Sequence, residues 1–279
     1  EQSYVFPDVA ERYAARLRER LNAGAYDGLD QPAALASTLE GDLRDVQPDA
    51  HLRISLSDAT AAPGPRRRRP PSGDQAFTDD RWLSEGVAYF RINALPGDAA
   101  SVQRMTELMD RYEDAHVLIL DLRDCPGGTL PAMDVLLSRL YAAPTELVRM
   151  ETRAAEDGRE PFDAAPSMHR MDAPAGIRRR SHWAVPTNPV SPLSEARIYV
   201  LTDRTASACE HLSMALQSTG RARLVGGTTR GANHYGGEVP FGGDRFQVFM
   251  PIGRTYDPRT GHDWETVGIT PDESVPPAE

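Results

Sequence analysis

The sequence predicts an α/β protein whose functional residues gather at the carboxyl edge of a parallel sheet. Short apolar runs alternate with segments in which apolar residues recur at helical spacing. The run 116–122 is almost continuously apolar, as expected for a parallel strand buried on both faces. That run and the run 198–201 lead directly into loops rich in glycine or serine, where α/β proteins bind their ligands. A chain of 279 residues, 40% of them hydrophobic, can bury such a core.

The first 56 residues predict a small helical lobe. Apolar residues recur every four positions in 8–21 and again in 35–43, so we expect two packed helices, followed by a short strand-like stretch that ends near Leu56. Residues 57–80 are rich in alanine, proline, glycine, arginine and serine without periodicity, which favours a linker. Residues 81–279 would then form the α/β core.

Within the core we expect strands and helices in alternation. The expected elements are a strand at 87–92, a helix at 99–112, a strand at 116–122, a helix at 132–141, a strand at 146–151, a strand at 198–201 with a helix to about 218, a strand at 246–250, and a last strand and turn at 264–272. Apart from its one strand, the stretch 143–195 favours a substrate-facing or flexible loop.

Composition excludes several classes of function. The net charge of −10 argues against nucleic acid or an anionic membrane as the main partner, so we expect the arginine runs 66–69 and 178–180 to be solvated loops. No apolar run has the roughly 18 residues of a membrane helix, and no signal-like segment opens the chain. We therefore expect a soluble protein, cytoplasmic or mature and secreted.

The basic residues and cysteines limit the possible chemistry. All 31 basic residues are arginine, which rules out a lysine base. Cys125 and Cys209 are too few for a disulfide framework, and we expect two small buried hydrophobic residues, with a reactive thiol as the less favoured alternative. No Cys/His cluster has zinc-site spacing, so the sequence predicts neither a metal nor a cofactor.

Ser207 follows the apolar run 198–201 and precedes a helical pattern. A serine at such a junction is exposed beside the unpaired N–H groups of a helix start, which suit a developing oxyanion. Ser207 and Glu210 also have the spacing of a capping box, in which the hydroxyl only stabilises the helix, and on its own this short pattern favours the cap.

Four stretches in order, 121–128, 201–210, 225–231 and 267–272, resemble the tail-specific (C-terminal processing) serine peptidase superfamily. The stretches 4–7, 24–26 and 49–53 are similar to the branch that contains interphotoreceptor retinoid-binding protein. The resemblance implies the ββα spiral core shared by ClpP-like and crotonase-like proteins, after a helical lobe.

The resemblance also implies a set of site residues. Because the chain has no lysine, a serine-lysine dyad is excluded and the tricorn-like arrangement of serine, histidine and glutamate remains. His51 stands where the D-x-H pattern of that arrangement places the base, and Glu265 where it places the orienting carboxylate. Asp263 and Asp49 are the alternatives to Glu265.

The remaining site residues are also taken from the resemblance. The backbone N–H of Ala208, with that of Gly127 or Gly128, would hold the oxyanion. His234 would be a substrate-side or structural residue and the second choice of base. Arg230 departs from the usual pattern of the glycine loop and would pair with a substrate carboxylate.

Other departures from the pattern bear on the expected efficiency. Gly227 stands where relatives often have a glutamate, and Ala50 cannot supply the helper hydroxyl of some tricorn-like sites. We expect His211, one turn after Ser207, to pack or cap its helix. The remaining histidines have no special context; they are His116, His169, His182 and His262.

Three functions remain open from the sequence. The first is a serine hydrolase that cleaves peptide bonds, near a peptide's C-terminus by family likeness, through an acyl-enzyme on Ser207. The second is a non-catalytic binder of a hydrophobic small molecule. The third is an esterase or tailoring hydrolase that acts on a small acyl substrate.

Overall fold

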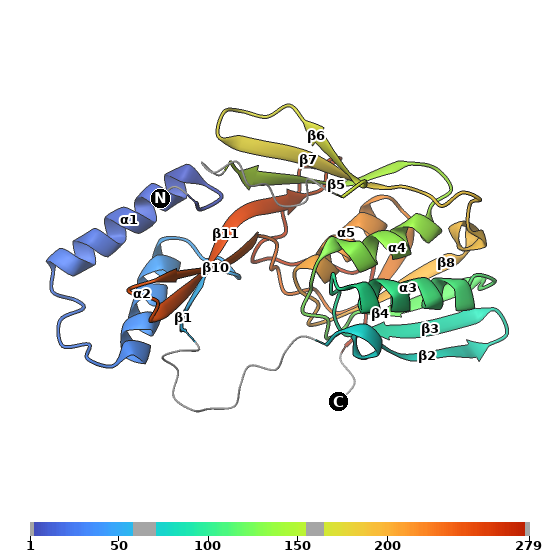
Figure 1. Ribbon diagram of the computed structural model, residues 1–279, viewed down its shortest axis with the longest axis horizontal. Helices are drawn as coiled ribbons and strands as arrows, with labels where there is room; N and C mark the ends of the chain where they lie inside the picture. Colours follow the sequence, from blue (N-terminus) through green and yellow to red (C-terminus); the bar gives the residue numbers. More distant parts are fainter. Residues whose placement is uncertain (1–2, 58–70, 155–164, 277–279) are drawn as a thin grey trace.

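The computed structural model describes residues 3–57, 71–154 and 165–276, and it confirms an α/β protein with a small helical N-terminal region (Figure 1). The helices are α1 (Pro7–Asn22), α2 (Pro32–Val46), α3 (Ala99–Arg111), α4 (Leu130–Leu140) and α5 (Ala208–Ser218), with short 3-10 helices η1 (Gly73–Ala76) and η2 (Pro192–Glu195). The strands are β1 (Arg53–Leu56), β2 (Phe77–Ser84), β3 (Val87–Ile92), β4 (Val117–Asp121), β5 (Thr145–Arg153), β6 (Met168–Met171), β7 (Ile177–Ala184), β8 (Arg197–Thr202), β9 (Ala222–Gly226), β10 (Tyr235–Phe241), β11 (Phe246–Tyr256) and β12 (Glu273–Ser274).

One sheet has the strand order β12-β9-β8-β4-β3-β2, and every neighbouring pair is parallel except β2 and β3. The expected parallel strands are therefore confirmed. Leu118 and Leu120 of β4 and Val200 of β8 are fully buried, whereas Ile119 and Tyr199, which alternate with them, are only partly buried. The expectation that β4 is buried on both faces is therefore wrong, because the structure fully covers only one face of these strands. The carboxyl ends of β4 and β8 carry the two loops that the sequence singled out.

The second sheet has the order β1-β11-β5-β7-β6, with β10 also paired to β11, and all of its pairs are antiparallel. The strand expected at 146–151 is confirmed as part of β5. The expectation of a loop over the rest of 143–195 is wrong for β6 and β7, whereas its residues 155–164 lie outside the described ranges.

The arginine run 178–180 lies in β7 and is not a solvated loop. Arg180 is only 2% exposed, and Arg179 binds the Glu151 carboxylate of the neighbouring strand β5 at 2.7 Å. Glu151 also binds Arg254 of β11 at 2.8 Å. The Glu151 carboxylate of the adjacent strand thus pairs with an arginine of this charged strand, and sequence spacing does not reveal such cross-strand pairing.

The helical N-terminal region is continuous with the second sheet. Tyr4, Val9 and Leu43 belong to its own hydrophobic cluster, while Val5 donates a 3.0 Å hydrogen bond to the Pro251 carbonyl of β11. β1 pairs with β11 over its whole length. The two expected helices are confirmed, and they are joined to the core by strand pairing.

The expected linker is shorter than the sequence predicts, because η1 and the start of β2 lie inside 57–80. The arginine run 66–69 lies outside the described residues. At the other end of the chain, the expected final strand and turn over 264–272 are confirmed only for the turn, which lies at 265–267; the rest of this stretch is irregular, and the short β12 follows it.

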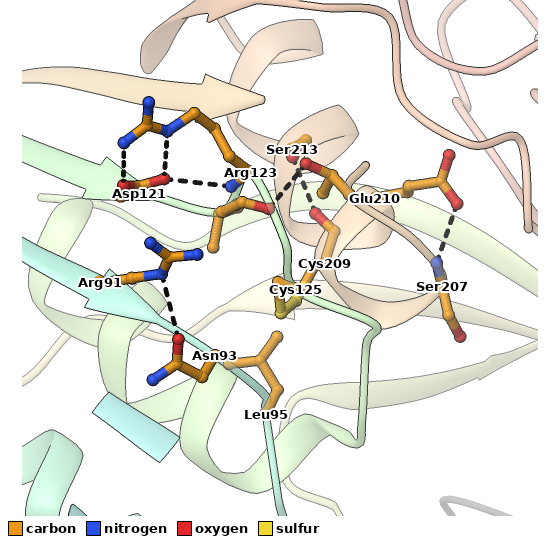
Figure 2. Close-up of a disulfide and its surroundings, with 12 residues drawn as sticks. Arg91, Asn93, Leu95, Asp121, Arg123, Cys125, Ser207, Cys209, Glu210 and Ser213 are labelled. Atoms are coloured by element: carbon orange, nitrogen blue, oxygen red, sulfur yellow. Dashed lines mark hydrogen bonds and ion pairs between the residues drawn. A yellow bond between two sulfur atoms is a disulfide. The ribbon is translucent and has the colours of Figure 1, made fainter. Parts of the chain in front are cut away.

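Cys125 and Cys209 are bonded to each other, so the expectation of two free thiols is wrong (Figure 2). Both cysteines are fully buried, as expected. The pairing follows from the fold: the loop after β4 packs against the start of α5, where the Ala206 N–H donates to the Cys125 carbonyl at 2.9 Å.

Among the described residues, no helix combines the length and the apolar character that a bilayer crossing requires.

Candidate active site

Ser207 has an unusual backbone conformation. It connects β8 to α5 with φ 54° and ψ −125°, in the region that favours glycine. A non-glycine residue there costs roughly 1–3 kcal/mol, and such residues cluster at functional sites. A sharp strand-to-helix turn of this kind exposes the nucleophilic serine of α/β hydrolases. The backbone therefore favours a functional serine over a simple helix cap.

Glu210 holds the turn at Ser207 in place. Its Oε2 accepts the Ser207 N–H at 2.8 Å, so the carboxylate half of the expected capping box is present (Figure 2). The same carboxylate accepts from the Thr229 hydroxyl and from the N–H groups of Gly231 and Ala232 at 2.6–2.8 Å. Burial raises the pKa of Glu210 even though these hydrogen bonds lower it. Glu210 thus fixes the helix start to the glycine loop.

Gly127 lies directly against Ser207. A Cβ at Gly127 would stand 2.6 Å from the Ser207 Cβ and 3.0 Å from the Ala208 nitrogen, and at Gly128 it would stand 1.9 Å from the carbonyl oxygen of Leu95. Both glycines have positive φ. Only glycine allows this loop to approach the serine so closely.

The N–H groups of Gly127, Gly128 and Ala208 are available as donors. In the described part of the chain, none of the three donates to a protein acceptor. Unpaired backbone N–H groups beside a nucleophile are what a developing oxyanion requires.

A cavity of about 50 Å³ adjoins Ser207. Its walls come from the loop after β4, from α5 and from the second sheet. The residues that line it are Gly128, Thr129, Leu130, Met150, Ser207, Ala208, His211, Asn233, Tyr235, Thr255 and Trp264.

His51 lies two residues before β1, with its ring stacked on Phe249 at a centroid distance of 5.3 Å. Its Nδ1 is buried without a hydrogen-bond partner. Within the described ranges, no hydrogen bond joins the His51 ring to Ser207 or Glu265. Burial lowers the pKa of His51 to about 4, so the ring is neutral at pH 7.

Glu265 binds backbone rather than an imidazole. Its Oε1 accepts the Ala50 N–H at 2.7 Å, and its Oε2 accepts the N–H groups of Asn233 and His234 at 2.7 and 2.9 Å. Burial raises the pKa of this carboxyl group. Glu265 therefore connects the segment that carries His51 to the segment that lines the Ser207 cavity.

His234 and Asp49 form a buried imidazole–carboxylate pair, with Nδ1 and Oδ2 2.7 Å apart. Burial opposes protonation, but the hydrogen bond with Asp49 raises the pKa of His234 above its usual value, and it lowers the pKa of Asp49. Asp263, the other alternative carboxylate, lies 3.9 Å from Nε2 of His234. The structure thus gives the second choice of base a carboxylate partner.

Asp49, His234 and Glu265 also place potential metal-ligand atoms within 4.8 Å of one another. Their oxygens are already used, because Asp49 accepts from Tyr4, His51 and Leu52 as well as bonding to His234. Glu265 is satisfied by its three N–H donors. The group therefore fits a hydrogen-bonded network better than a metal site.

Arg230 lies outside the cavity and is exposed. Its backbone N–H donates to the Thr205 carbonyl at 2.9 Å, which fixes it near Ser207. In the part of the chain that the structure describes, no ion pair involves its guanidinium.

A pair of hydrogen-bonded histidines lies beside Ser207, and the sequence did not predict it. His211 lines the cavity and its Nε2 lies 2.8 Å from Nδ1 of His182, whose Nε2 lies 2.8 Å from Oδ1 of Asp134. The three residues come from α5, β7 and α4, so no local pattern joins them. The position of His211 one turn after Ser207 was the only signal available.

The sequence of this chain is similar to a known protein family and to a curated protein. The family model described as Peptidase family S41 matches residues 86–275. A carboxyl-terminal-processing protease from Picosynechococcus sp. is 32% identical over 202 residues, covering 71% of this chain and 41% of that protein. The chain therefore spans less than half the length of this curated relative.

Solved structures share the fold at low identity. A candidate peptidase from Parabacteroides merdae has a TM-score of 0.62 at 15% identity, covering 96% of this chain and 81% of that one. A lipoprotein from Streptococcus agalactiae has a TM-score of 0.59 at 17% identity, covering 95% and 83%. Mature CPAF in complex with lactacystin has a TM-score of 0.52 at 18% identity, covering 67% and 47%.

Proposed function

Because this chain belongs to peptidase family S41, we propose that it is a serine peptidase that cleaves peptide bonds through an acyl-enzyme on Ser207. The observation that carries the proposal is the positive φ of Ser207 at the junction of β8 and α5, directly against Gly127. A strained serine beside free N–H donors has the arrangement of an acyl-transfer nucleophile.

In the proposed reaction, the Ser207 hydroxyl attacks the scissile carbonyl carbon while an imidazole takes its proton. The carbonyl oxygen becomes an oxyanion, which accepts hydrogen bonds from the N–H of Ala208 and from that of Gly127 or Gly128. The imidazolium then protonates the leaving amine as the C–N bond breaks. Water activated by the same imidazole hydrolyses the acyl-enzyme.

We assign the base to His51, whose ring is neutral and whose Nδ1 has no partner. Glu265 supports this role by holding the Ala50 N–H, next to His51 in the chain. Its expected role of orienting the imidazole directly would require the His51 ring to turn towards it when substrate binds. His234 is the second candidate base, favoured by its 2.7 Å contact with Asp49.

For the substrate we propose a peptide cleaved near its C-terminus. The curated relative is a carboxyl-terminal-processing protease, and the exposed residue Arg230, whose backbone N–H binds the carbonyl of Thr205 two positions before Ser207, suits a terminal carboxylate. The cavity of about 50 Å³ is far smaller than the roughly 300–1,000 Å³ of typical small-molecule sites. No observation in this cavity therefore favours the hydrophobic-ligand binder.

A fluorophosphonate probe tests the proposal. It should label the wild-type protein at Ser207, and the Ser207→Ala variant should not be labelled. Ser138→Ala, which changes a serine of α4, is the control and should keep its labelling. Folded wild-type protein with an unmodified Ser207 would overturn the assignment. Peptide and ester panels run with the same samples would separate a peptidase from an esterase.

A further inference from the structure

A chain of three side chains leads from the surface of the molecule to the cavity beside Ser207. Asp134 is partly exposed, His182 is fully buried, and His211 is 5% exposed and lines the cavity. Both hydrogen bonds along the chain are 2.8 Å long. The second oxygen of Asp134 accepts from the Ser167 hydroxyl at 2.7 Å, which fixes the carboxylate.

For a neutral His182, the connectivity of the chain determines where its protons lie. An ionised carboxylate only accepts, so the proton of a neutral His182 must be on Nε2, which faces Asp134. Nδ1 of His182 is then an acceptor, and His211 must donate to it from Nε2. A neutral His211 is left with an unprotonated Nδ1. Burial holds the pKa of His211 well below its usual value, which keeps this ring neutral.

Besides the Ser207 hydroxyl and the unpaired backbone N–H groups of the proposed oxyanion donors, two side chains of this cavity offer a polar atom to a ligand: His211 through its Nδ1 acceptor and Trp264 through its unpaired Nε1 donor. The Tyr235 hydroxyl is bound to Thr152 and to the Glu151 carbonyl. The Asn233 side chain is bound to the backbone of Thr255 and to Asp263. Leu130, Met150 and Trp264 contribute walls that are largely apolar. A ligand group in this space therefore meets a small volume, apolar walls, one imidazole acceptor and one indole donor, and a hydroxyl group can bond to both.

We propose that Asp134, His182 and His211 make this cavity selective for a small substrate side chain that donates a hydrogen bond, as serine and threonine do. The inference rests on the proposed function, since the cavity receives a substrate side chain only if Ser207 is the nucleophile. His211 acts as a specificity residue, and Asp134 and His182 act through it as positioning residues.

The expected selectivity follows from the cost of an unpaired acceptor. The hydroxyl of a threonine side chain can donate a hydrogen bond to Nδ1 of His211. The isosteric valine shields Nδ1 from solvent and offers no donor, so the acceptor stays unpaired. One buried polar group left unpaired costs enough to change a rate about tenfold, and a well-built site discriminates more strongly.

Two peptidyl phosphonate diphenyl esters provide the test. They differ only in carrying a threonine or a valine side chain next to phosphorus, and the second-order rate of Ser207 modification is measured for each. The wild-type protein should react about tenfold faster with the threonine probe. His211→Phe removes the acceptor, and the ratio should fall to one or below.

Asp134→Asn tests the chain itself. An amide can donate as well as accept, so the proton positions of the two rings are no longer fixed and the ratio should fall towards one. Asp110→Asn is the matched control: it makes the same change at an exposed carboxylate that binds Arg139, and it should keep the wild-type ratio.

The outcomes separate this inference from the proposed function. Equal rates with both probes in the wild-type protein, or an unchanged ratio in Asp134→Asn or His211→Phe, would overturn the inference while Ser207 labelling persists. Failure of both phosphonates and of the fluorophosphonate to modify Ser207 would overturn the proposed function and the inference with it.

Discussion

Glu265 accepts a 2.7 Å hydrogen bond from the backbone N–H of Ala50, which lies 215 positions earlier in the chain. Its other oxygen accepts the N–H groups of Asn233 and His234. One carboxylate thus holds together the segment before β1 that carries His51 and the loop that reaches the Ser207 cavity. Glu265 therefore acts by fixing the backbone of the candidate site.

Glu265→Gln should weaken this connection, because the amide NH₂ is itself a donor and cannot accept hydrogen bonds from the backbone N–H groups that it would face. We expect the free energy of unfolding to fall by about 2 kcal/mol and fluorophosphonate labelling to slow by about two orders of magnitude. Urea unfolding and labelling kinetics measure both effects. Glu273→Gln, at a surface carboxylate 3.9 Å from Arg223, is the control. Unchanged labelling in Glu265→Gln would contradict this role.

The pH dependence of labelling distinguishes the two candidate bases. A general base works when deprotonated, so the rate falls as the pH drops through the pKa of the base in the free enzyme. For His51, with a pKa of about 4, labelling should remain fast at pH 5. For His234, whose pKa is raised above 6.5, labelling would already decline below neutral pH.

The variants His51→Gln and His234→Gln complete that comparison. We expect His51→Gln to lose labelling by a factor of about 10³ at all pH values and His234→Gln to retain an acid limb near pH 4. The reverse pattern would transfer the role of base to His234.

Gly127→Ala should block acylation without unfolding the protein. The added methyl group would stand 2.6 Å from the Ser207 Cβ, and moving the loop would displace the proposed oxyanion donors. We expect labelling to slow by about 10²–10³. Gly176→Ala is the control, because Gly176 also has a positive φ but has no atom near its Cβ position. A rapid reaction of Gly127→Ala would remove this loop from the proposed mechanism.

The disulfide between Cys125 and Cys209 should contribute to both stability and reactivity. It joins residues 84 positions apart, and a bond that closes a loop of this length stabilises a protein by about 4 kcal/mol. The double variant Cys125→Ala, Cys209→Ala should unfold at lower urea concentration and label more slowly. A reducing agent should not change the urea stability or the labelling rate of the variant. If full reduction leaves both quantities unchanged in the wild-type protein as well, the disulfide does not contribute to them.

Arg230→Gln should reduce the preference for a free peptide C-terminus. We compare the cleavage of one peptide as its C-terminal acid and as its amide, and we expect the ratio to fall about fivefold, as for an exposed ion pair. Arg223→Gln removes another exposed guanidinium and should leave the ratio unchanged. If the wild-type protein does not distinguish acid from amide, Arg230 does not bind the terminus.

Local patterns sufficed to predict the parallel sheet and the junction at Ser207. The strand β4 is an apolar run, and α3 follows its N-cap Asp98, whose side chain accepts the Ser101 N–H. The second sheet escaped prediction because β7 holds consecutive arginines, which are compatible with a strand only when Glu151 lies across from them. Sequence spacing contains no information on such a partner.

The candidate site was also predictable only in part. The contact of Gly127 with Ser207 follows from two loops at the same sheet edge, which the alternation of strands and helices implies. By contrast, the pairs Asp49–His234 and His182–His211 join elements far apart in the chain. Their partners depend on the packing of the second sheet, and so does the backbone role of Glu265.

The pairing of β1 with β11 bears on how this protein can be dissected. A fragment cut to the family-matched span, 86–275, would keep Ser207 but discard β1, Asp49 and His51, and it would uncover an edge of β11. Such a recombinant fragment would retain the motifs that match the family but would lose the contacts that Asp49 and Ala50 make with His234 and Glu265. A recombinant fragment should therefore begin before α1 and not at the first residue of the family match.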